Sequence, residues 1–219
     1  MTADRTRFGP AVFGHRGGDG GPENSLEAIR SAIEAGADGV EIDLQVGPAG
    51  RVAVGHDPID WSTSRAHSIG LAELLSVVDK GGIDLLIDFK STGDPLAEAI
   101  IMAEALTAAA RPEAILVSSF NVAFLRHLRE LAPELVLCPI VSLRQNFPRP
   151  VDHERWDGFS VLAAALINPF YLRQSAAGRR LFVWFAATEW SWLIRLIARW
   201  RVDGVVVSDI GRTVKLLAR

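Results

Sequence analysis

Side chains that can carry out acid–base and ion-binding chemistry gather in the first quarter of the chain. His15, Glu41, Asp43 and His56 each lie within or directly after a short apolar run, and Arg16 follows the first histidine. A polar group at the end of a buried segment is costly to place unless it has a partner or a function. We therefore expect these five residues to share one functional site.

A third carboxylate, Asp88, lies further along the chain and is followed by Lys90. Alternation along a strand puts Glu41 and Asp43 on one face. Three neighbouring carboxylates repel one another unless a hard cation with oxygen ligands sits between them. Mg²⁺ or Ca²⁺ fits such a site better than zinc, which favours nitrogen and sulfur. The alternative is that the carboxylates pair with Arg16 and Lys90.

The two histidines, His15 and His56, suit proton transfer because imidazole titrates near neutral pH. A lone histidine at a strand end is more often a satisfied core residue, but two beside a carboxylate cluster favour catalysis. Arg16 can make a forked contact with phosphate, and Lys90 adds a point charge. Together these groups fit the cleavage of a phosphate ester.

The overall composition and net charge indicate no particular charged partner. The chain has 219 residues, is 49% hydrophobic and 22% charged, and carries a net charge of -3, an ordinary globular balance. Neither a nucleic acid nor an anionic membrane is the obvious partner. The lone cysteine, Cys138, allows no intramolecular disulfide, and we expect it to be a buried strand residue. No apolar segment reaches the length of a membrane span, so we expect a cytoplasmic protein without stable membrane insertion.

Short apolar strands alternate with amphipathic helices along the chain. We expect strands over 11–14, 39–46, 52–55, 84–89, 114–117, 135–141, 158–162, 181–186 and 204–207. We expect Asn24 to cap the first helix and Thr188 to cap a helix over 189–200. About eight such units predict an α/β fold, a single (β/α)₈ TIM barrel domain over residues 1–219. An open doubly wound sheet is the alternative, but no Gly-x-Gly-x-x-Gly follows the first strand.

Polar residues at the strand ends should meet at one mouth of this barrel. They are His15, Glu41, Asp43, Asp88, Lys90, Ser118, Trp184 and Asp209. A weak repeat, Asp-Gly at 38–39, 157–158 and 203–204, precedes three strands and is typical of a tight helix-to-strand turn. We expect Trp190 and Trp192 to pack within an amphipathic helix. The alternatives are an apolar leaving-group pocket or contact with lipid.

Several motifs together resemble the glycerophosphodiester phosphodiesterases. The motifs are His15-Arg16-Gly17, Pro22-Glu23-Asn24-Ser25, Glu41-Ile42-Asp43, His56-Asp57, Ser118-Ser119-Phe120 and the late block 202–209. The resemblance implies a (β/α)₈ barrel and a phosphodiesterase that depends on a divalent metal. It implies metal ligands at Glu41, Asp43 and Asp88, and an acid/base pair at His15 and His56.

The same resemblance places substrate contacts at Arg16, Lys90 and Trp184, with a small phosphodiester as the partner. It implies the products glycerol 3-phosphate and an alcohol such as choline or ethanolamine. The sequence departs from the family's pattern in three places, which alter the part of the site that would recognise the alcohol group of the substrate. The insertion after the second histidine is much reduced, and Asp88 replaces the usual Glu, which is similar to the sphingomyelinase D branch. The family's Trp-Thr-Val-Asn block is here Trp184-Phe185-Ala186-Ala187.

Two other functions remain open at this stage. Asp88-x-Lys90, the short insertion and the tryptophan-rich late helix favour a phospholipase D-like cleavage of a lysophospholipid or sphingolipid. The lost Thr and Asn after Trp184 favour a barrel that binds phosphate without turnover. The presence of both histidines argues against that third interpretation.

Overall fold

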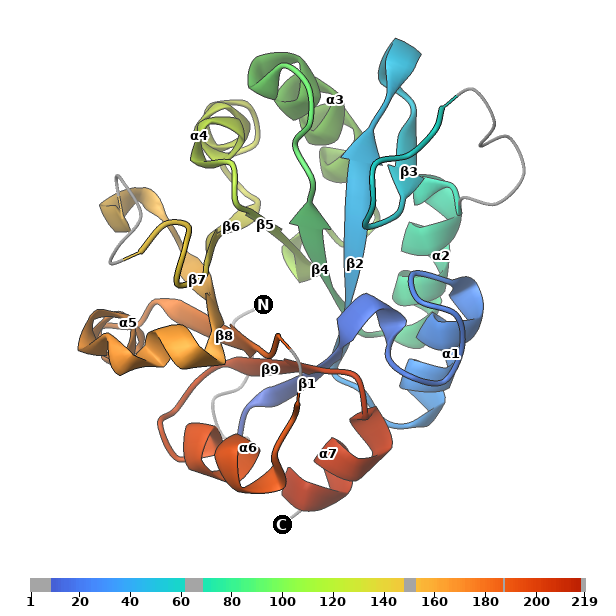
Figure 1. Ribbon diagram of the computed structural model, residues 1–219. Helices are drawn as coiled ribbons and strands as arrows, with labels where there is room; N and C mark the ends of the chain where they lie inside the picture. The colour runs from blue at the N-terminus through green and yellow to red at the C-terminus, as the bar shows by residue number, and fades with distance from the viewer. Residues whose placement is uncertain (1–8, 62–68, 148–152, 187, 218–219) are drawn as a thin grey trace.

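Eight parallel strands close into a barrel. The computed structural model describes residues 9–61, 69–147, 153–186 and 188–217. The parallel strands are β1 (Ala11–Gly14), β2 (Gly39–Val46), β4 (Asp84–Phe89), β5 (Ile115–Ser119), β6 (Val136–Val141), β7 (Gly158–Leu162), β8 (Arg180–Trp184) and β9 (Gly204–Val207). Their order around the ring is β1-β9-β8-β7-β6-β5-β4-β2, and pairing of β1 with β2 closes it (Figure 1). The predicted TIM barrel is confirmed.

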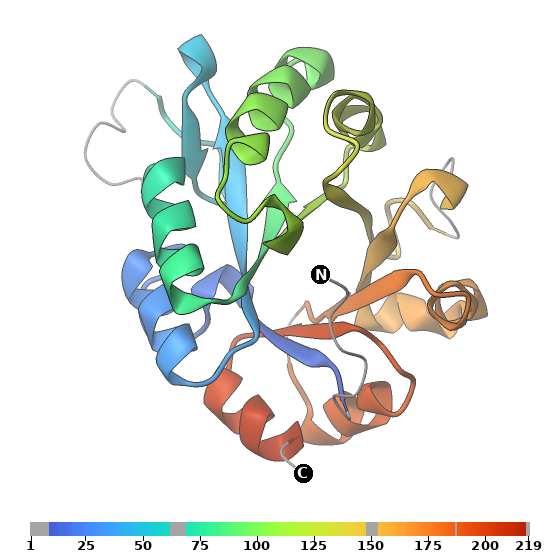
Figure 2. The same cartoon turned by 180° about the vertical axis from the view of Figure 1, so that it is seen from behind.

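Helices cover the outside of the barrel, as both views show (Figures 1 and 2). They are α1 (Leu26–Glu34), α2 (Leu71–Gly81), α3 (Pro95–Thr107), α4 (Val122–Leu131), α5 (Pro169–Ala176), α6 (Ser191–Ala198) and α7 (Ile210–Leu217). β3 (Val52–Val54) pairs antiparallel with β2 to form a hairpin. Only residues 55–70 connect β3 to α2, and 62–68 of these lie outside the described residues. Among the described helices, none combines the length and apolar character needed to cross a bilayer.

The two faces of each strand build two separate cores. Outward side chains such as Val40, Ile42 and Leu44 of β2 are fully buried against the helices. Inward side chains form a plug inside the barrel, made of Phe13, Leu86, Leu116, Cys138, Phe182 and Val206. The rings of Phe13 and Phe182 meet edge to face with centroids 5.5 Å apart. Because side chains alternate, the next inward positions above this plug are free to line a pocket.

The Asp-Gly repeat links neighbouring strands instead of serving only as a turn. The carboxylates of Asp38, Asp157 and Asp203 accept hydrogen bonds from the backbone N–H of the preceding barrel strand, at 2.8–2.9 Å. The glycine that follows each aspartate leaves room for a neighbouring side chain. A Cβ at Gly39 would clash with the Phe13 ring at 2.3 Å, and a Cβ at Gly204 would clash with the Phe182 ring at 2.7 Å. None of the three glycines has a positive φ. The repeat therefore fixes strand register at the end of the barrel away from the mouth.

Two predicted helix caps are wrong. Ser25, not Asn24, caps α1, because its hydroxyl accepts from the N–H of Ala28 at 3.1 Å. The helix expected over 189–200 begins only at Ser191, with Trp190 and not Thr188 as its N-cap residue. Glu189 stays outside that helix because its carboxylate accepts from the backbone N–H of Ser208 at 2.5 Å. This bond holds Glu189 at the start of α7.

Candidate active site

A pocket of about 150 Å³ opens at the mouth of the barrel. Its walls include inward-facing residues just above the plug, such as Asp43 of β2, Asp88 of β4 and Trp184 of β8, which alternate with outward-facing neighbours along each strand. Its lining includes the predicted site residues His15, Arg16, Glu41, Asp43, His56, Asp88, Lys90 and Trp184. Asp209, also expected at the mouth, instead accepts a hydrogen bond from the N–H of Arg212 at the start of α7.

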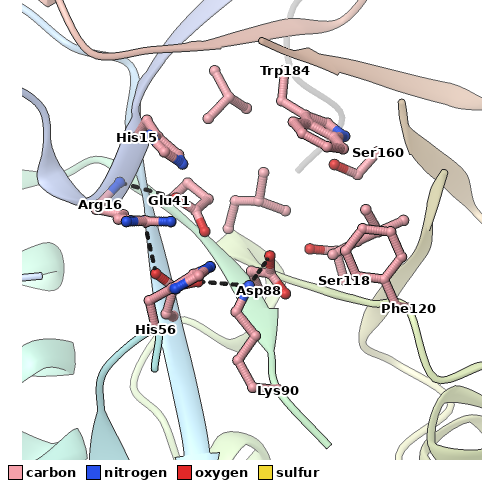
Figure 3. A pocket seen from close by; sticks show the side chains of 14 residues that line it. His15, Arg16, Glu41, His56, Asp88, Lys90, Ser118, Phe120, Ser160 and Trp184 are labelled. Carbon is pink, nitrogen blue, oxygen red and sulfur yellow. Dashed lines mark hydrogen bonds and ion pairs between the residues drawn. The ribbon is translucent and has the colours of Figure 1, made fainter. Parts of the chain in front are cut away.

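Strand register brings two of the carboxylates side by side. Asp43 on β2 is the register partner of Asp88 on β4, which in turn lies beside Ser118 on β5. Oxygen atoms of Glu41, Asp43 and Asp88 all lie within 4.8 Å of one another. Figure 3 shows Glu41 on the same side of the pocket as His15 and His56, with Asp88 between that side and Ser118. The sheet geometry alone therefore concentrates negative charge at this point.

The alternative pairing with basic side chains is present as well. Lys90 Nζ lies 2.9 Å from Asp43 Oδ1 and 2.6 Å from Asp88 Oδ2. Arg16 Nε lies 3.1 Å from the second oxygen of Asp43. Burial works to lower the pKa of Lys90, but its ion pairs with the two aspartates outweigh burial and raise it. Both basic side chains therefore remain charged inside the pocket.

The pKa shifts of Glu41 and Asp88 indicate that these pairs do not neutralise the cluster. Burial, with the neighbouring Asp43 and Asp88, raises the pKa of Glu41 well above its usual value. Burial is also the main cause that raises the pKa of Asp88 to about 6, and Asp43 adds to it. Oδ1 of Asp88 is buried and has no hydrogen-bond partner among the described residues. A close set of carboxylate oxygens with one buried oxygen unused could hold a hard cation.

A strained turn positions the first histidine. The segment His15–Gly17 forms a single helical turn after β1, and Arg16 has φ 50° and ψ 34°, in the left-handed region. That conformation is unfavourable for a residue with a side chain. Here the backbone N–H of Arg16 donates to Glu41 at 2.9 Å, and its carbonyl accepts from the N–H of Asn24 at 2.8 Å. The strain is held by site residues, which ties the position of His15 to the carboxylate cluster.

The environments of the two histidines differ. Burial, with the Arg16 guanidinium second, lowers the pKa of His15, so its ring is neutral near pH 7. His56 follows β3 and its side chain is 43% exposed. The Nδ1 of His56 lies 2.9 Å from a carboxylate oxygen of Asp57, which can only accept, so Nδ1 carries hydrogen and Nε2 is left for other partners.

Asn24 is a site residue that the capping interpretation missed. It has φ 58°, and its amide nitrogen donates to Asp43 Oδ2 at 2.9 Å while its carbonyl oxygen accepts from the N–H of Asp43 at 3.1 Å. This double contact fixes the orientation of the central carboxylate. The signal was available in Asn24-Ser25, because Ser25 alone suffices as a cap and leaves the asparagine without a local role.

The opposite wall of the pocket is mainly apolar. Figure 3 shows Trp184, Ser160 and Phe120 across the pocket from the carboxylates, and Ile140 also lines it. Nε1 of Trp184 is buried without a hydrogen-bond partner in the described part of the chain. Such a donor is costly to leave unpaired and is available to an oxygen of a bound molecule. Phe185 and Ala186 follow it, whereas Ala187 lies outside the described residues.

The loop after Lys90 is fixed by a buried carboxylate. Glu98 on α3 is 3% exposed and accepts hydrogen bonds from Ser91 Oγ at 2.5 Å, the N–H of Thr92 at 3.0 Å and the N–H of Gly93 at 2.8 Å. The sequence contains no signal for this role, because Glu98 lies in an ordinary first helical turn. We infer that Glu98 positions the segment that carries Lys90.

We expect Glu98→Ala to lower the free energy of unfolding by about 2–4 kcal/mol, since each buried donor left unsatisfied costs roughly 1–3 kcal/mol. Urea denaturation followed by circular dichroism measures this change. Glu104→Ala, at an exposed position of the same helix, is the matched control and should stay within about 0.5 kcal/mol of the wild type. Equal destabilisation by the two variants would contradict the role of Glu98.

Comparisons with known proteins agree with this geometry. Residues 15–79 match the glycerophosphoryl diester phosphodiesterase family. A 47-residue segment is 51% identical to the YqiK protein of Bacillus subtilis (strain 168), so the match spans 21% of this chain and about a fifth of that relative's length. A glycerophosphodiester phosphodiesterase of Caldanaerobacter subterraneus subsp. tengcongensis is 26% identical over 95% of this chain and 98% of its own.

The fold also recurs among solved structures. A phosphodiesterase of Oleispira antarctica, solved in complex with the product sn-glycerol-3-phosphate, superimposes with a TM-score of 0.77. It is 20% identical, and the alignment covers 97% of this chain and 98% of that one. The match over residues 15–79 and the relative aligned along nearly the whole length make this chain similar to the glycerophosphoryl diester phosphodiesterase family, and the solved structures share its fold.

Proposed function

We propose that this protein hydrolyses a glycerophosphodiester to glycerol 3-phosphate and an alcohol, in a reaction that depends on a divalent cation. The observation that carries the proposal is the cluster of Glu41, Asp43 and Asp88 beside two histidines and two basic side chains in one pocket. The family match over residues 15–79 supports it, and so does the product sn-glycerol-3-phosphate in the structure of the Oleispira antarctica phosphodiesterase. That residues 1–219 form one domain and that the protein is cytoplasmic stay predictions.

The three carboxylates would hold the cation, either Mg²⁺ or Ca²⁺. When bound, such an ion neutralises the phosphodiester and lowers the pKa of an attacking oxygen. Arg16 and Lys90 would contact the phosphate oxygens, because both lie at the pocket wall and carry positive charge. Asn24 would keep Asp43 oriented through its two hydrogen bonds.

The histidines would move the protons. His15, neutral near pH 7 by its lowered pKa, would take the proton of the attacking oxygen, from water or from a hydroxyl of the substrate. As the new P–O bond forms, the P–O bond to the alcohol breaks, and the leaving oxygen would take a proton from Nε2 of the doubly protonated His56 ring, which keeps its hydrogen on Nδ1. The carboxylate of Asp57 holds the other nitrogen of that ring. The unpaired Nε1–H of Trp184 is placed to donate to an ester or hydroxyl oxygen.

A phospholipase D-like cleavage of a lysophospholipid or sphingolipid is the second candidate. The apolar pocket wall favours it, because Phe120, Ile140 and Trp184 can accept an acyl chain more readily than a charged alcohol. The metal ligands and proton carriers would be the same. The two substrates differ in the apolar surface that they bring to the mouth.

Turnover of glycerophosphocholine against lysophosphatidylcholine tests both candidates. With Mg²⁺ or Ca²⁺ present, we expect release of glycerol 3-phosphate from the first, measured by a coupled enzymatic assay. Faster release of choline from the lysolipid, with lysophosphatidic acid as the other product, would favour the second candidate. If calorimetry shows that either compound binds but no product is released, the result would support a barrel that binds phosphate without turnover.

A further inference from the structure

The mouth of the barrel has two chemically different halves. β1, β2 and β4 carry the charged side chains of the pocket, and in the strand order these lie directly across the ring from β6, β8 and their neighbour β7. Figure 1 shows β2 and β7 on opposite sides of the barrel. The loops that follow β6, β7 and β8 therefore border the mouth on the side away from the carboxylates.

Those three loops expose large apolar side chains. Leu143 and Phe147 follow β6, Ile167 follows β7, and Trp190 and Trp192 follow β8, the last at the start of α6. We refer to these five residues as the apolar rim. Ile167 is 77% exposed, and the two tryptophans are 53% and 62% exposed. Because β6, β7 and β8 are neighbours in the barrel, their three connections place the rim on one side of the mouth, and large apolar side chains exposed together in this way mark an interaction site.

The tryptophans do not pack in the core, so the packing expected from the helical pattern is wrong for them. α6 buries Ile194 and Ile197 against the barrel, which leaves Trp192 on the outer side of the helix. The rings of Trp190 and Trp192 stack on each other, with centroids 6.1 Å apart and planes at 15°. Tryptophan is an amphipathic ring that favours the boundary between water and lipid.

Charge around the mouth is divided in the same way. Among the described residues that directly follow β6, β7 and β8 (142–147, 163–168, 185–186 and 188–190), Arg144 is the one exposed charged residue, because the side chain of Glu189 is turned toward α7. The exposed Glu154, Arg155 and Asp157 end the connection from β6 to β7 and lie away from the mouth, where Arg179, just before β8, donates to the carbonyl of Glu154. Arg195 is exposed one turn after Trp192. The opposite half carries exposed carboxylates, at Asp19, Glu23, Asp57 and Asp60. The net charge of -3 is therefore unevenly spread, and the rim combines apolar and positive groups.

We propose that the apolar rim docks on the surface of a bilayer that contains anionic phospholipid. Exposed tryptophans with flanking arginines are the chemistry that binds such a surface, through apolar burial and attraction to the headgroups. The carboxylates of the opposite half would remain in water. Docking in this way would bring the apolar pocket wall of Phe120, Ile140 and Trp184 close to molecules held in the bilayer.

Vesicle co-sedimentation of the full chain tests this proposal without reference to catalysis. Wild-type protein should pellet with vesicles of equal parts phosphatidylglycerol and phosphatidylcholine, and much less with phosphatidylcholine alone. Binding should weaken as salt is raised, because exposed charges are screened. Absence of binding to the anionic vesicles would overturn the proposal, and it would leave the proposed hydrolysis of a soluble substrate untouched.

Variants separate the rim from other exposed tryptophans. The double variant W190A/W192A should weaken binding to anionic vesicles by about tenfold or more, since binding scales with buried apolar area. Arg144→Glu should also weaken it. Trp200→Ala is the matched control, because Trp200 is 37% exposed at the other end of α6, and its binding should be unchanged. An equal loss of binding in Trp200→Ala would contradict a specific role of the rim. A wild-type dimer in light scattering that W190A/W192A converts to a monomer would show that the rim is instead an interface between two copies of the chain.

Discussion

Replacing His15 with alanine is expected to lower kcat for phosphodiester hydrolysis by about 10²–10⁴-fold, the range that general acid–base groups contribute. The fold should survive, because His15 lies in a short turn above the plug and is not part of either core. His56→Ala should cause a loss of the same order. Stopped assays of product release, with thermal melting to check folding, measure both effects.

The two histidines should be distinguishable by pH and by leaving group. His15 acts in its neutral form and its pKa is lowered, so the rise of kcat/KM with pH should lie below the usual value of about 6.5. His56→Ala should recover activity on a p-nitrophenyl ester, whose leaving group needs no proton. His127→Ala, on α4 away from the pocket, should keep wild-type turnover. Turnover near the wild type in His15→Ala would remove it from the mechanism.

Removal of divalent cations should abolish turnover, and the ion should also stabilise the fold. Binding at a hundredfold excess over Kd adds about 2.7 kcal/mol. A chelator should therefore lower Tm by several degrees, and Mg²⁺ or Ca²⁺ should restore both Tm and activity. Asp88→Asn should lose most of this gain in Tm, whereas Asp19→Asn, exposed near the mouth, should keep it.

The gain in Tm from the ion should depend on pH in a defined direction. The pKa of Asp88 is raised to about 6 from an unfolded value near 3.8, so between these values the cation-free native state binds more protons than the unfolded chain. Its stability therefore falls as pH rises through that window. Protons also compete with the ion, so the ion should raise Tm more at pH 7.5 than at pH 5. Chelation without effect on activity or Tm would refute the metal site.

Much of the fold and of the charged half of the site follows from strand periodicity. Alternation placed Glu41 and Asp43 on the inner face of β2, and the ends of β1 and β4 placed His15 and Asp88 at the same mouth. The parallel register of β2 and β4 explains why two of the carboxylates are neighbours, because it sets Asp43 beside Asp88. These inferences need only local patterns and the rule that active sites of such barrels lie at the carboxyl ends of strands.

The residues that the sequence did not reveal depend on contacts distant in the chain. Asn24 and Ser25 carry the same local signal for a cap, and only Asp43 decides which of them is free for the site. Glu189 stays outside the helix predicted for it because its carboxylate accepts a hydrogen bond from the N–H of Ser208, just before α7. Helical spacing indicated an amphipathic α6, but spacing cannot show that Trp192 lies on the outer side of that helix and stays 62% exposed.

The two halves of the mouth come from separate stretches of the chain. The carboxylates, both histidines and Lys90 all precede residue 91, whereas the apolar wall from Phe120 onward and the whole rim follow it. The family match at 15–79 falls entirely within the first stretch. The groups proposed to break the bond and the residues proposed to select the leaving group can therefore change independently. Substitutions after β5 can alter substrate preference while the reacting groups stay the same. Replacing the corresponding segment of a relative with residues 136–186 should transfer the preference for a leaving group and leave the mechanism of bond cleavage unchanged.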